Sequence, residues 1–351
     1  MFAIIKKILC NTKLDHFVLQ HKVVLRNLYT VYEKEFSDVT PFCSLNISLP
    51  YNIILEPLDL YNYPNCDKVI IRIESNKQFQ PLIKHKRVAH GLNLFGNDET
   101  SHAICRIAAP IKASINATSE NGNITLKNFN GKTIGIKTGN GNINVSKLHC
   151  EHISLTSLAG NITCKTVLQA ADIHLHTGKN GDISTEKLLG INLSVITASG
   201  NINTMSSYCN NSHFTTESGY LNLHNVHKNC HIVCTETAKV NLVSFDGNLQ
   251  ACMERGEANI QIARIEGDSK ITMTKEGALK LKLSNECLES STFKILAKDL
   301  EINKDISVLL SEDDNYKIIR NDTSISNTLI HCPYGGVVVE SLSWKEMFNL
   351  G

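Results

Sequence analysis

The chain has 351 residues, and its 35 Lys and Arg residues nearly balance its 34 Asp and Glu residues, for a net charge of +1. This balance excludes the strongly basic surface of a nucleic-acid-binding groove. A content of 42% hydrophobic and 20% charged residues excludes a disordered, highly charged chain. No apolar run approaches the ~18 residues that a membrane-spanning helix needs, so we expect no transmembrane segment.

Residues 1–36 are predicted to form a basic, acid-poor leader. Between Met1 and Thr30 there are five Lys or Arg residues and a single acidic residue, Asp15. Apolar residues recur there at helical spacing, at Leu14, Phe17, Val18, Leu25 and Leu28. This pattern is similar to a mitochondrial transit peptide and favours a mitochondrial protein. The alternative is an amphipathic helix packed on the end of the fold of a cytoplasmic protein.

Residues 37–110 are rich in proline and poor in glycine, yet their apolar and polar residues alternate, as in Ser44–Leu49 and Lys68–Ile73. Alternation with a period of two is the signature of a half-buried strand. The sequence therefore predicts N-terminal strands that cap the open edge of the fold that follows.

Residues 111–306 contain a repeat in which a small residue precedes a polar and then an aliphatic residue. Successive copies are 19 to 21 residues apart and begin at Gly122, Gly141, Gly160, Gly181, Gly200, Gly219, Ala238, Ala258, Gly277 and, faintly, Lys298. Each period carries two short alternating segments, for example Ile143 with Val145 and Ile153 with Leu155. A third apolar position follows the first segment. No proline interrupts this region, as continuous strand pairing requires.

Two strands in about 20 residues leave no room for the helices of ankyrin-type or tetratricopeptide-type repeats. The sequence predicts an all-β fold, a single-stranded parallel β-helix or β-solenoid of about ten coils stacked ~4.8 Å apart. Pairs such as Asn121-Gly122 are expected to place a residue that tolerates positive φ at each corner. Asn123, Asn142 and Asn161 are expected to stack and exchange amide hydrogen bonds.

Residues 307–351 are predicted to form a C-terminal coil and cap. Gly335–Val339 is similar to one further coil, and the single tryptophan, Trp344, is expected to plug the terminal core. The chain has 12 cysteines but no Cys-x-x-Cys motif, and it is too long to need a disulfide framework. We expect free thiols in a reducing compartment.

Histidines are the main candidates for a site. Aligning the coils by their apolar residues predicts one outward column, made of Thr133, His152, Asp172, Asn192, His213 and His231. Imidazole and carboxylate groups at ~5 Å spacing are suited to zinc. The alternative is a solvated polar face, because alternation points these side chains outward. We assign no catalytic, cofactor-binding or metal-binding residue and no cofactor, and retain one candidate surface cluster: His152, Asp172, His174 and His176.

Two enzymatic interpretations receive little support from the sequence. His149 and Cys150 are adjacent, but neighbours on a strand point to opposite faces, so thiol and imidazole are not expected to meet. Polysaccharide lyases also use parallel β-helices, but the short coils here leave no walls for a substrate groove.

The repeats resemble the bacterial "putative adhesin" domain of unknown function, whose coils carry a similar Gly-Asn-Ile pattern. The flanks resemble the animal proteins called family with sequence similarity 185, in Leu49-Pro50, Glu56–Asp59, Tyr63–Val69, Cys332–Val337 and Ser343-Trp344. The resemblance covers roughly residues 40 to 348. It implies a β-solenoid and a mitochondrial address, and it carries over no catalytic residues.

The sequence favours a non-catalytic scaffold or interaction module that binds protein partners along its long strand faces. The alternative is an enzyme, or a metal-binding or carbohydrate-binding protein, with a site on one face of the solenoid. A clustered groove of acidic and basic residues would favour the enzyme, and no coil shows one. The ligand is unknown at this point, and nucleic acid is not expected.

Overall fold

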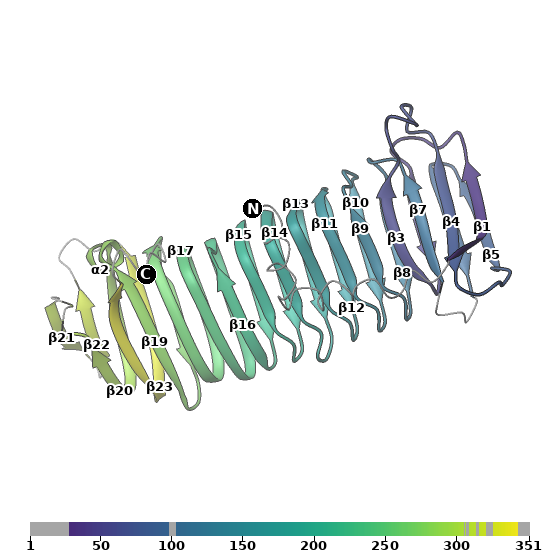
Figure 1. The fold of residues 1–351 in the computed structure, drawn as a ribbon. Coiled ribbons are helices and arrows are strands. Elements are labelled where there is room, and N and C mark those ends of the chain that lie inside the picture. Colours follow the sequence, from purple (N-terminus) through teal and green to yellow (C-terminus); the bar gives the residue numbers. More distant parts are fainter. Residues whose placement is uncertain are drawn as a thin grey trace, which may run out of the picture.

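A computed structural model describes residues 28–97, 103–304, 306, 309–313, 316–320 and 326–342. The described part is an elongated stack of strands with one short helix, α2 (Asn285–Ser290) (Figure 1). The predicted all-β class is confirmed. No helix in these ranges is long and apolar enough to cross a membrane. Most of the predicted leader, residues 1–27, and Trp344 lie outside the described residues.

The strands follow one another with short connections. The N-terminal strands are β1 (Tyr29–Phe36), β2 (Ser44–Ser48), β3 (Asn52–Pro57), β4 (Val69–Ser75), β5 (Ile83–Val88), β6 (Gly91–Gly96) and β7 (Ile104–Ala109). The repeat region contains β8 (Ser114–Ser119), β9 (Ile124–Lys127), β10 (Thr133–Thr138), β11 (Ile143–His149), β12 (His152–Ser157), β13 (Ile162–Thr177), β14 (Ile183–Thr197), β15 (Ile202–Thr216), β16 (Gly219–His224), β17 (His227–Ile265), β18 (Ser269–Met273) and β19 (Gly277–Ser284). The C-terminal strands are β20 (Ser291–Ile302), β21 (Leu309–Asp313), β22 (Tyr316–Arg320) and β23 (Ser326–Leu342).

Strands of the repeat region pair in parallel with the strands one repeat further along the chain. Ile143 pairs with Ile162, which in turn pairs with Ile183. Strand β13 shows the path of one coil: residues 162–165 lie on what we call the first face, residues 167–170 on the second face and residues 172–177 on the third face. Equivalent residues of the other coils lie on the same faces, so each outward position becomes a column along the stack.

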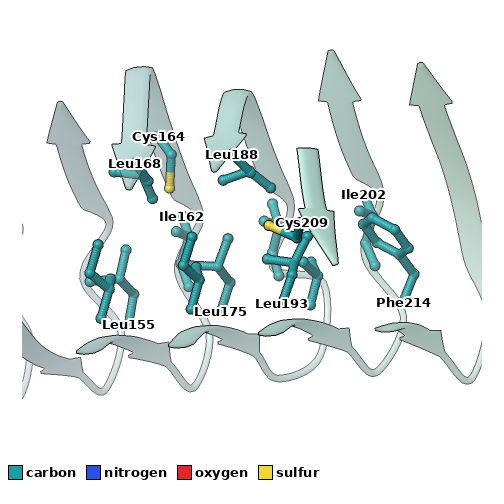
Figure 2. Packing of buried hydrophobic residues seen from close by; sticks show 14 of the residues in the cluster. Leu155, Ile162, Cys164, Leu168, Leu175, Leu188, Leu193, Ile202, Cys209 and Phe214 are labelled. Carbon is teal, nitrogen blue, oxygen red and sulfur yellow. The ribbon is translucent and has the colours of Figure 1, made fainter. Parts of the chain in front are cut away.

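The core fills the space between the faces. Inward residues of the third face, such as Leu155 and Leu175, and of the second face, such as Leu168 and Leu188, are at most 1% exposed. Figure 2 shows these rows of side chains pointing towards one another inside the stack. Because each coil buries its apolar residues against its neighbours, stability is distributed along the whole repeat region.

The repeat glycines are needed for close approach between coils. A Cβ atom on Gly141 would lie 2.0 Å from the carbonyl oxygen of Gly122. The predicted pairs Asn121-Gly122 and Asn140-Gly141 do not use their tolerance of positive φ, since none of their residues is among those with positive φ. Left-handed backbone occurs instead at the corner between the first and second faces, at Asn128 (φ 62°), Lys147 (φ 50°) and Thr166 (φ 64°).

The glycine column also departs from the predicted alignment. Gly256 pairs with Gly277, whereas Ala258 pairs with Leu279 and is buried. The prediction that Ala258 continues the column is therefore wrong, and Gly256 takes that position. The reason is that the coil between Ala238 and Gly256 is shorter than the others and the next coil is longer. A nearly constant period predicts neither change in length.

The predicted stack of asparagines exists, but with different hydrogen bonds. The backbone N–H of Asn142 donates to Oδ1 of Asn123 over 2.7 Å, and the N–H of Asn161 donates to Oδ1 of Asn142 over 2.8 Å. The side chain therefore acts as an acceptor for the next coil. An aspartate can do the same, and the N–H of Asn201 donates to Oδ1 of Asp182 over 2.7 Å.

Both ends of the stack contain a coil that is inserted out of sequence order. Strand β2 lies between β6 and β8, and β3 lies between β7 and β9. At the other end, β23 lies between β19 and β20. Antiparallel strands complete each end: β1 pairs with β4, and β22 pairs with β20. Because β1 (Tyr29–Phe36) belongs to this cap, the last part of the predicted leader 1–36 is a strand of the fold.

Candidate interaction faces

A continuous hydrogen-bonded column crosses five coils of the third face. It consists of His152, Asp172, Asn192, Asn211 and Asn229, and we call it the amide ladder. Asn229 Nδ2 donates to Asn211 Oδ1 (3.1 Å), Asn211 Nδ2 to Asn192 Oδ1 (3.0 Å) and Asn192 Nδ2 to Asp172 Oδ1 (2.8 Å). All of these amides donate in the same direction along the stack.

The carboxylate of Asp172 terminates this ladder. It accepts from Asn192 on one side, and its Oδ2 lies 2.8 Å from His152 Nδ1 on the other. The hydrogen bond from Asn192, followed by the one from His152, holds the pKa of Asp172 below its usual range. An ionised carboxylate accepts hydrogen bonds and donates none. Asp172 can therefore accept from Asn192 in one neighbouring coil and from His152 in the other. His152 is exposed and Asp172 is partly exposed, and ion pairs in such positions contribute little to stability.

The structure brings together only part of the predicted cluster. His174 and His176 follow Asp172 on β13 and are exposed on the same face, as alternation predicts. His174 pairs with Ser154 and Ser194, and His176 pairs with Thr156 and Ile196, so each lies in its own column. Among the described residues, no group of three or more His, Cys, Asp or Glu side chains could hold a metal ion.

The predicted column is wrong for its last two members. It continues from Asn192 to Asn211 and Asn229, whereas His213 and His231 lie in the neighbouring column with Ser194. The cause is Ser212, which is 3% exposed and occupies the inward position between Leu193 and Cys230. Because this core position holds a serine, an alignment of the coils by their apolar residues places the start of the third-face segment too late in this coil.

A second network on the second face was missed from the sequence. The rings of Tyr208 and His227 stack with centroids 4.7 Å apart and planes at 15°. Lys187 Nζ lies 5.6 Å from the Tyr208 ring centroid, and His227 Nδ1 lies 3.6 Å from Asp246 Oδ2. Arg264 donates two hydrogen bonds to the Asp246 carboxylate, at 2.9 and 3.2 Å.

The charge on Asp246 is maintained by this network. Burial alone would raise the pKa of the carboxyl, but the hydrogen bonds and positive charge of Arg264 outweigh it, so the pKa lies below its usual value. The sequence does contain a signal for this column. His227 and Asp246 each directly follow a residue of the third apolar position, Val226 and Phe245, whereas Tyr208 follows Ser207.

The thiol of Cys150 is in an environment that disfavours a nucleophile. It is buried, and burial raises its pKa to about 12. His149 is exposed on the outer surface, so the two neighbouring side chains point apart, as expected for a strand. The 11 described cysteines are all free thiols.

These columns on an all-β stack define a repeat protein with extended polar faces. A model of the Toastrack DUF4097 family matches residues 65–224 and, in a second overlapping match, residues 160–328. The chain belongs to the Toastrack DUF4097 family. This membership supports the repeat-domain part of the resemblance predicted from the Gly-Asn-Ile coils.

The chain is also similar to solved bacterial proteins. It is 10% identical to a protein of Parabacteroides distasonis described as a putative adhesin, with 89% of this chain and 96% of that chain covered and a TM-score of 0.40. It is 11% identical to a putative adhesin of Parabacteroides merdae, with 89% and 96% covered and a TM-score of 0.36.

Proposed function

We propose that this protein is a non-catalytic interaction module, a single-stranded parallel β-helix of about ten coils that binds a protein partner along its third face. The amide ladder is the observation that carries the proposal. Its hydrogen bonds hold side chains of five successive coils in fixed positions before any partner arrives. Side chains that are already ordered lose less entropy on binding, so a regular row of weak contacts can add up to useful affinity.

The rest of the third face is suited to a polar partner surface. His174 and His231 are exposed, and Ser194 and His213 are partly exposed, in the column beside the ladder. These groups offer both donors and acceptors to a partner. No cofactor is needed for such a function, because the fold supplies the rigidity and the side chains supply the contacts.

Three substitutions across consecutive coils test this proposal. We expect the triple variant Ser154→Lys, His174→Glu and Ser194→Lys to lose partner binding while staying folded. Alternating the signs places opposite charges on adjacent strands, so the coils still attract one another. The measurement is quantitative affinity purification of the full chain from its native compartment, followed by binding of the purified partner to the purified variants.

The matched control carries the same charges on the first face of the same three coils: Asn144→Lys, Thr163→Glu and Ser184→Lys. It should retain the partner. Equal binding by wild type and the third-face variant would contradict the proposal, as would loss of binding in both variants. A single change such as His152→Ala or Asp172→Ala should have little effect, and complete loss there would indicate one discrete site instead.

We propose that the chain groups with the animal proteins called family with sequence similarity 185 and carries a mitochondrial address. The flanking motifs support the grouping, and the excess of Lys and Arg between Met1 and Thr30 supports the address. Residues 1–28 fused to a fluorescent protein should accumulate in mitochondria. Changing Lys6, Lys7 and Lys13 to Glu should abolish this, and a diffuse signal from both fusions would contradict the proposed address.

A further inference from the structure

Two histidines beside the amide ladder face each other across adjacent coils. His213 on β15 pairs in register with His231 on β17. Their Nδ1 atoms are 3.0 Å apart, and their ring centroids are 4.7 Å apart at an angle of 59°. They line a groove of about 340 Å³ together with Asn211, Asn229 and Gln250.

A hydroxyl on the same strand orients the first of these rings. Nε2 of His213 lies 2.8 Å from Oγ1 of Thr215. When Nε2–H donates to this hydroxyl, Nδ1 of His213 carries a lone pair, which can accept a hydrogen bond from Nδ1–H of His231 or bind a metal ion. Metal-bound histidines are oriented in the same way, by a hydrogen bond from the ring nitrogen that does not bind the metal.

The environment also disfavours the protonated form of His213. Burial, and then the positive charge that His231 acquires when protonated, lower the pKa of His213. Neutral imidazole is the form that binds metals. His231 can offer its own Nδ1 lone pair by transferring its proton from Nδ1 to Nε2 through solvent, so no net proton is lost.

The separation of the two nitrogens matches that of two ligands on one metal ion. With metal–nitrogen bonds of about 2.0–2.1 Å, two ligands are about 2.9 Å apart at a right angle and about 3.3 Å apart at a tetrahedral angle. We propose that Nδ1 of His213 and Nδ1 of His231 bind one divalent first-row transition-metal ion of the kind that prefers imidazole, Cu²⁺ or Zn²⁺. Water molecules in the open groove complete the coordination.

Titration of the full chain with Cu²⁺ tests this assignment, because Cu²⁺ binds such ligands more tightly than Zn²⁺ does. Isothermal titration calorimetry gives the dissociation constant, and electron paramagnetic resonance reports nitrogen ligands. We expect His213→Asn and His231→Asn each to weaken the tight site at least tenfold. His174→Asn is the matched control, because His174 lies in the same column but pairs with Ser154 and Ser194, and it should leave the tight site unchanged.

Thr215→Val removes the orienting hydroxyl and keeps both ligands. We expect it to weaken binding by about tenfold without changing the stoichiometry, in the range known for such orienting partners. Circular dichroism checks that each variant is folded. If a histidine variant fails to fold, Thr215→Val provides the test of the proposal. An unchanged dissociation constant for Cu²⁺ in Thr215→Val would overturn the proposal. Equal weakening by His174→Asn, or tight binding that survives both His213→Asn and His231→Asn, also overturns it.

Discussion

The substitution Ile162→Asp is expected to unfold the protein, whereas Thr163→Asp is expected to leave it folded. Ile162 is 0% exposed and lies between Ile143 and Ile183 of the adjacent coils. Thr163 is its outward neighbour and is partly exposed. An unpaired carboxylate in an apolar core costs several kcal/mol, against a total stability of about 5–15 kcal/mol for a typical domain.

Thermal melts followed by circular dichroism distinguish the two variants. The Ile162→Asp chain should lose its cooperative transition or melt far below the wild type, while the Thr163→Asp chain should melt within a few degrees of it. The two positions are adjacent in sequence and receive the same side chain. A difference in melting temperature therefore reflects whether the position faces inward or outward. Equal melting temperatures would contradict the inward and outward assignment of this strand.

Gly141→Ala is expected to destabilise the protein strongly. The added Cβ would lie 2.0 Å from a backbone oxygen of the preceding coil, which cannot rotate away. The two coils would have to separate, and we expect a loss of about 3 kcal/mol in the free energy of unfolding, the upper part of the usual range for overpacking. Urea unfolding of the purified protein measures this loss.

Gly135→Ala is the matched control for this experiment. A Cβ there would meet only the side chain of Asn116, which can move. Alanine does occur naturally in the glycine column at Ala238, but both neighbours, Gly219 and Gly256, have positive φ (142° and 127°). Gly122 and Gly160, the neighbours of Gly141 in the same column, do not have positive φ. An unfolding free energy of Gly141→Ala equal to that of Gly135→Ala would show that coil spacing does not depend on the glycine.

The repeat and the inward positions could be predicted because alternation is a local property of the chain. The register of the third face could not be predicted beyond Asn192, because Ser212 fills a core position. A register shift of two residues leaves inward side chains inward and outward side chains outward. Alternation therefore cannot reveal such a shift. The facing rings of His213 and His231 were therefore placed in the wrong column, although their mutual alignment was right.

The inserted end coils could not be predicted for a different reason. Nothing in the local pattern of Ser326–Leu342 indicates that it pairs with both β19 and β20, since this depends on contacts between segments far apart in sequence. The network of Tyr208, His227 and Asp246 could be predicted from the sequence in principle, because its residues are regularly spaced. It was missed because Ser207 interrupts the apolar position that precedes it.

The inserted end coils determine how the molecule responds to mechanical force. In a simple solenoid, tension on the terminal strand peels one coil at a time, since that coil has a single neighbour. Tension applied through Leu342 would instead act on β23, which is held by parallel strands on both sides. Extracting it requires shearing two ladders at once. At the opposite end, pulling on Tyr29 would detach β1 from β4 and then meet the same double attachment at β2 and β3.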